Sequence, residues 1–146
     1  MREEDLIDSL SDILTNLKTS DDKFATPLFK KVIKNNIPIW TAINDTPSIA
    51  FYISHTEYTN NRYSNNVVAE VVIFIYNRHK KTGLSLDDIL SPLVTKTRYA
   101  VKELVNQNEN IISSDIIESN KDGGTILPYT VAELVFQVEF VEEPLC

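Results

Sequence analysis

The chain has 146 residues, of which 42% are hydrophobic and 24% are charged, and its formal net charge is −7. These values are typical of one folded domain, so we expect a single domain over residues 1–146. The negative charge disfavours a general nucleic-acid-binding protein, because binding to phosphates requires clustered Lys and Arg. The apolar runs are short, whereas a membrane-spanning helix needs about 20 apolar residues, so we expect no contact with a membrane.

The first predicted element is an amphipathic helix from Glu3 to Lys18. Its apolar residues recur at spacings of three and four: Leu6, Leu10, Ile13, Leu14 and Leu17. Acidic residues in the first turn and Lys18 in the last turn agree with the helix macrodipole. The following segment, residues 24–43, contains two prolines, and we expect short edge strands or irregular chain there.

A hairpin is predicted next. Apolar residues alternate with others from Ile49 to Ser54, which indicates a strand. The stretch from Val67 to Tyr76 is apolar in both alternating rows, which favours a central strand covered on both faces. The polar, Asn-rich residues from His55 to Asn66 have no apolar period, so we expect a long exposed loop between the two strands.

A second helix is predicted over residues 85–106, starting near Ser85 with an acidic first turn. Pro92 removes one backbone hydrogen bond and should kink this helix. Alternatively, Ser91 caps a new helix in which Pro92 occupies the first position.

The last predicted unit is another hairpin. Residues 111–118 can form a strand, Asn120 to Gly124 indicates a turn, and the residues from Tyr129 to Val141 alternate clearly between apolar and polar rows. The order of elements predicts an α+β fold, with an antiparallel sheet of about four or more strands and two helices packed on one face.

No pattern of catalytic or ligand-binding residues emerges from the sequence. His55 and His79 lack partners at metal-ligand spacing, the single cysteine is Cys146, and the glycines lie outside phosphate-loop motifs. We therefore expect no enzyme activity, no metal and no cofactor. Two alternatives stay open. One is a metal-dependent nuclease built on scattered carboxylates, and the other is a small binding or regulatory module that uses the 55–66 loop and the basic turn at residues 78–81.

Two helices can cover only one face of the predicted sheet, which leaves an apolar row beside acidic residues on the last strand. Contiguous apolar surface on a small domain usually marks a protein interface. We therefore expect an interface formed by this strand and the 55–66 loop, with the candidate residues Tyr58, Arg62, Tyr63, Val131, Glu133, Val135 and Glu139.

The succession of elements resembles that of the tail terminator, or tail completion, proteins of long-tailed bacteriophages. The resemblance is carried by PSIAFYISHTEYTNNRYSNNVVAEVVIFIYNRH, LSLDDILSPLVTKTRYAVKELVNQ and IISSDIIESNKDGGTILPYTVAELVFQVEFVEE. It implies a structural protein of the virion, located at the tail-neck junction and assembled in the host cytoplasm. It also implies a homo-oligomeric ring, a hexamer, which caps the tail tube, ends tube growth and joins the tail to a head connector or neck protein. DNA would pass through the bore without specific binding.

Overall fold

Three helices and five strands make up the fold of the computed structural model, which describes residues 1–19, 23, 25–34, 47–60, 65–78, 86–121 and 129–142. At residues 60, 78, 86–90, 121 and 129–130 it describes the backbone alone. The helices are α1 (Glu3–Thr15), α2 (Leu86–Lys102) and α3 (Leu104–Gln107). The strands are β1 (Lys31–Lys34), β2 (Ser48–Asn60), β3 (Asn65–Arg78), β4 (Ile111–Lys121) and β5 (Tyr129–Val141).

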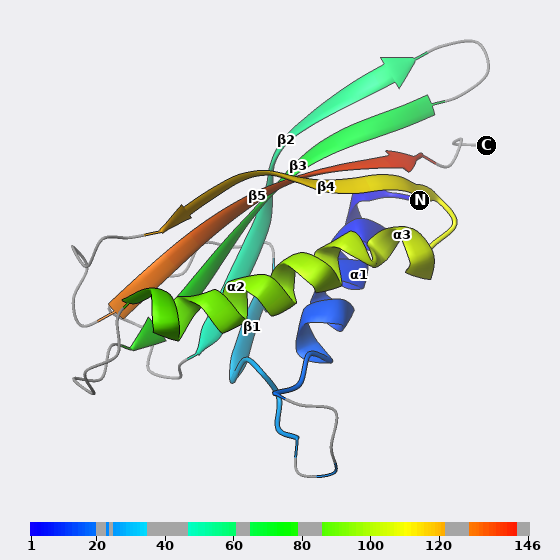
Figure 1. Ribbon diagram of the computed structural model, residues 1–146. Coiled ribbons are helices and arrows are strands. Elements are labelled where there is room, and N and C mark those ends of the chain that lie inside the picture. The colour runs from blue at the N-terminus through cyan, green and yellow to red at the C-terminus, as the bar shows by residue number, and fades with distance from the viewer. Residues whose placement is uncertain are drawn as a thin grey trace.

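The strands form one sheet in the order β1-β2-β3-β5-β4. Strand β1 runs parallel to β2, and the other three pairings are antiparallel. Figure 1 shows the long helix α2 lying across the sheet, and the far ends of β2 and β3 extending beyond it. The predicted α+β class is confirmed, with the addition that the parallel strand β1 makes the sheet mixed.

The main core lies between the helices and one face of the sheet. Leu6, Leu10 and Leu14 of α1 and Val101 of α2 are at most 1% exposed, and they belong to one apolar cluster with the sheet. Strand β5 contributes every second residue to that cluster: Ala132, Leu134, Phe136, Val138 and Phe140. The alternating pattern that predicted this strand therefore identifies its buried row correctly.

Helix α1 is shorter than the sequence pattern predicted. It ends at Thr15, with Asn16 as its C-cap, so Lys18 does not lie in its last turn. Instead, Lys18 forms an isolated antiparallel bridge with Pro27. Leu17 keeps the apolar period because it still packs against the core after the helix has ended. Regular spacing of apolar residues indicates which residues are buried, not where a helix ends. A residue after the helix end can still be buried when the chain continues along the core.

Helix α2 is continuous through Pro92, so the predicted alternative of a new helix capped by Ser91 is wrong. The helix ends at Lys102, and the short helix α3 follows after Glu103. The buried hydroxyl of Ser114 on β4 donates to the carbonyl oxygen of Val101 at 2.9 Å. A helix leaves its last carbonyls without intrahelical partners, so this contact satisfies one of them and joins α2 to the sheet.

The β2–β3 hairpin is much longer than predicted. Strand β2 continues to Asn60, and β3 begins at Asn65, so the predicted loop from His55 to Asn66 is wrong for all but residues 61–64, which lie outside the described residues. The polar residues pair in register with β3, for example Glu57 with Val68 and Thr59 with Asn66. Their side chains carry no apolar period, but backbone pairing does not require one.

Candidate interaction surface

The sheet face opposite the helices, here called the second face, has an apolar half and a polar half. In the apolar half, Ala50, Tyr76 and Val131 form a small buried cluster that Ile33 and Phe74 extend. The ring of Phe74 stacks between Tyr52 and Tyr76, with centroids 6.3 and 6.2 Å away. Burial raises the pKa of the Tyr76 hydroxyl to about 12.

A β-bulge in β2 begins the polar half. The pairing register with β3 shifts between Ile53 and His55, which leaves Ser54 as the extra residue. Before the bulge, Ile49, Phe51 and Ile53 pack against the main core, whereas after it His55 and Glu57 pair with Glu70 and Val68 on the second face. The bulge therefore changes which alternating row of β2 faces the helices.

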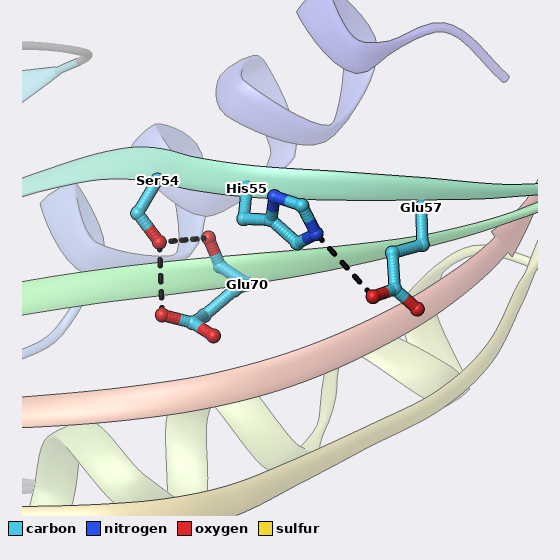
Figure 2. Close-up of polar contacts among 4 residues, drawn as sticks. All are labelled: Ser54, His55, Glu57 and Glu70. Atoms are coloured by element: carbon cyan, nitrogen blue, oxygen red, sulfur yellow. Dashed lines mark hydrogen bonds and ion pairs between the residues drawn. The ribbon is translucent and has the colours of Figure 1, made fainter.

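Figure 2 shows the contacts around this bulge. The Ser54 hydroxyl donates to Glu70, at 3.3 Å from the backbone oxygen and 3.0 Å from Oε1. The Nε2 atom of His55 lies 3.3 Å from Oε1 of Glu57, and these two side chains are 63% and 73% exposed. The serine hydroxyl is thus bonded to a carboxylate and the imidazole contacts a different one. A nucleophile and base pair would need the hydroxyl and the imidazole within hydrogen-bond reach of each other.

Carboxylates from four strands gather on the second face. The register places Glu70 of β3 and Asp115 of β4 on either side of Gln137 of β5. Asn66 donates to Oε1 of Glu139 at 3.2 Å. We call this set the acidic sheet surface: Glu57, Glu70, Asp115, Glu118, Glu133 and Glu139.

A shallow hollow of about 140 Å³ lies within this polar half. His55, Glu57 and Glu70 line it together with an apolar and an amide side chain from β4 and β5, Ile117 and Gln137. It is smaller than the roughly 300–1,000 Å³ of typical small-molecule sites. The surface therefore suits contact with a macromolecule or repulsion of an anion better than enclosure of a ligand.

The predicted interface residues that the structure describes do not all lie on one face of the sheet. Tyr58 is 55% exposed, but it pairs with Val67, which belongs to the main core, so it lies on the helix side of the sheet. Glu133 and Glu139 are half-buried on the second face. Arg62 and Tyr63 lie outside the described residues, as do His79 and residues 80–81 of the predicted basic turn.

The expectation that Val131 and Val135 belong to exposed apolar surface is wrong. They are only 6% and 5% exposed within the single chain. Val135 pairs with Val72, which is itself 6% exposed, and Val131 belongs to the small cluster with Tyr76. These two valines are therefore largely covered within the single chain and add little apolar surface for contact with another chain.

Two further hollows, which the sequence interpretation missed, lie on the helix side. The first, of about 310 Å³, is a groove between α2 and β4. The α2 residues in it are Thr95, Arg98, Tyr99 and Lys102, all exposed, and Tyr99 is 69% exposed. Their spacing of i, i+3, i+4 and i+7 places them on one face of the helix. The same spacing could have been recognised in the sequence, next to the apolar residues that predicted the helix.

The second hollow, of about 400 Å³, lies beside α1. Asp5, Asp8, Ser9 and Asp12 line it from the helix, and the rest of the lining is Met1, Asn108 and Asn110. The N-terminal ammonium of Met1 donates to the carbonyl oxygen of Val141 at 3.0 Å, so the three aspartates outnumber the one cation among the described residues at this hollow. The sequence interpretation assigned Asp5 to the first turn, where the macrodipole favours it, and Asp8 and Asp12 to the polar side of the amphipathic helix, but it did not group the three. These aspartates form an acidic patch on the outer face of α1.

Within the described residues, no group of three or more His, Cys, Asp or Glu side chains is arranged to hold a metal ion. In the same part of the chain, no helix is both long and apolar enough to cross a membrane. A scan against protein-family models matches none of them to this chain, and a search of curated proteins finds no match. The function is therefore inferred from the geometry of these surfaces.

Proposed function

We propose that this protein is a structural subunit that assembles with copies of itself into a closed ring. The resemblance to tail terminator proteins suggests where this ring acts. The ring would cap the tail tube of a long-tailed bacteriophage, end tube growth and join the tail to a head connector or neck protein. No catalysis is part of this function.

The acidic sheet surface is the observation that supports the proposal best. Its six carboxylates come from β2, β3, β4 and β5 and lie on one face of the sheet. Among the described residues that line the polar hollow, His55 is the one side chain that can carry a positive charge. Negative potential on a surface repels phosphates over roughly one Debye length, about 8 Å at physiological salt. A ring that turned this face toward its bore would let DNA pass without binding it.

The alternative of a small binding module loses part of its basis. It relied on a long exposed loop from His55 to Asn66, and most of those residues are paired strand. The hairpin end that projects in Figure 1 is therefore an extension of the sheet rather than a separate binding loop.

Light scattering and negative-stain electron microscopy of the purified protein test the proposal. We expect particles several times the 16.6 kDa subunit mass, and closed rings in the images. A protein that stays strictly monomeric at high concentration, or that forms only open fibres, would contradict the ring.

A further inference from the structure

We propose that the exposed stripe of α2 in one copy binds the acidic patch on α1 of the next copy. This inference rests on the proposed ring and names its subunit contact. A closed ring needs a heterologous contact, in which one patch on each subunit meets a different patch on its neighbour. The described residues contain two patches of opposite charge on different helices: the groove with Arg98 and Lys102, and the hollow with Asp5, Asp8 and Asp12.

The two patches match in spacing as well as in charge. On α2 the lining residues are Thr95, Arg98, Tyr99 and Lys102, and on α1 they are Asp5, Asp8, Ser9 and Asp12. Both sets follow i, i+3, i+4 and i+7, and each covers about 10 Å along a helix at a rise of 1.5 Å per residue. With the two helices parallel and level, Asp8 meets Arg98 and Asp12 meets Lys102.

The remaining positions agree with this register. Tyr99 is the most exposed of the large apolar side chains in the described residues, at 69%, and it would lie level with the small side chain of Ser9. Tyr and Arg side chains are enriched at the centres of protein interfaces. Asp5 would lie level with the uncharged Thr95, which suits it, because its carboxylate already accepts a hydrogen bond from the backbone N–H of Arg2 at 2.8 Å.

The charged groups are available for this contact. The Nζ atom of Lys34 lies 3.5 Å from Oδ1 of Asp8, but both side chains are mostly exposed, at 59% and 66%, and such surface pairs are weak. Asp115 of β4 also lines the groove, although it pairs with Gln137 in the row of residues that faces the second face. The arginine and lysine outweigh it, so the groove is basic on a protein whose net charge is −7.

Charge reversal tests the contact directly. In one variant, Arg98→Glu and Lys102→Glu make both patches acidic, and in the other, Asp8→Lys and Asp12→Lys make both basic. Each variant alone should associate about 100-fold more weakly or worse than the wild type, because like charges across an interface cost several kcal/mol. Mixed in equal amounts, the two variants should recover the wild-type particle size by light scattering, since each then offers the patch that the other needs.

Matched controls reverse charges away from the two patches: Lys30→Glu with Lys31→Glu, and Glu57→Lys with Glu118→Lys, all at exposed positions that line neither the groove nor the hollow. These controls should assemble as the wild type does, and circular dichroism should be unchanged in every variant. If the wild type forms rings and the two patch variants also do so, the contact is wrong and the ring stands. Variants that fail alone and are not rescued by mixing also overturn it. If the wild type is monomeric, both the ring and the contact fail.

Discussion

The Ser54 hydroxyl donates to Oε1 of Glu70 at 3.0 Å, across the bulge at which the second face changes from apolar to polar (Figure 2). The contact joins the unpaired residue of β2 to the neighbouring strand, at the point where the register shifts. Beyond this contact, the register places His55 opposite Glu70.

Replacing Ser54 with Ala should lower the free energy of unfolding by about 0.5–1.5 kcal/mol, because a side-chain hydrogen bond contributes about that much. Urea unfolding followed by circular dichroism measures the change. Thr59→Ala, on an exposed residue of the same strand, is the control and should stay within about 0.5 kcal/mol of the wild type. Equal effects of the two substitutions would show that the contact with Glu70 does not stabilise the hairpin.

Replacing Val135 with Lys should destabilise the monomer itself. Val135 is 5% exposed and lies between Val72 of β3 and Glu118 of β4, so the longer, charged side chain would have to push its neighbours aside to reach water, at a cost of about 1–3 kcal/mol. Gln137→Lys, two residues further along the same face at an exposed position, should have little effect. Denaturant unfolding compares the two, and a stable Val135→Lys protein would show that this part of the sheet opens easily.

Replacing Ser114 with Ala should lower stability by about 1–3 kcal/mol, because it leaves the carbonyl of Val101 buried without this donor. Ser119→Ala, at an exposed position of the same strand, serves as the control. Hydrogen exchange at the end of α2 should become faster in the Ser114 variant and stay unchanged in the control. Unaltered exchange would mean that the hydroxyl does not hold the helix end.

Tyr76 should make the folded protein sensitive to strongly alkaline pH. Its pKa is raised to about 12 in the folded state, above the ordinary value near 10, so its contribution to stability is complete below pH 10 and is lost as the pH rises through 12. A spectroscopic titration should therefore show a late phenolate step that Tyr76→Phe removes. Tyr99→Phe should keep that step, and a late step that survives Tyr76→Phe would assign it to another residue.

The acidic sheet surface should prevent the assembled protein from binding DNA. Glu57→Lys with Asp115→Lys reverses two exposed charges on the second face, and we expect salt-dependent retention of double-stranded DNA that the wild type does not show. Glu103→Lys with Glu109→Lys changes the net charge equally at positions outside that face. Filter binding at low and high salt compares them, and equal retention by both variants would mean that net charge, not the placement of the carboxylates, governs the effect.

The spacing of apolar residues along the sequence was enough to predict the elements in which one regular spacing runs from end to end. Strand β5 alternates without a bulge from Tyr129 to Val141, and the leucines of α1 recur at helical spacing, so burial on one side is written directly into both segments. The same logic predicted the α+β class and the two helices on one face of the sheet.

Tertiary structure decided what local pattern does not encode. The bulge at Ser54 reverses the alternation in β2, and the polar strand beyond it exists because β3 supplies backbone partners. Strand β5 pairs with both β3 and β4, which brings Glu70 and Asp115 beside Gln137, and the folded chain leaves Val131 and Val135 only 6% and 5% exposed. Pairing between strands that are distant in the sequence sets which residues share a face and which apolar side chains stay exposed. The spacing of residues within one strand does not indicate which strand it will pair with, so the sequence pattern could not predict this.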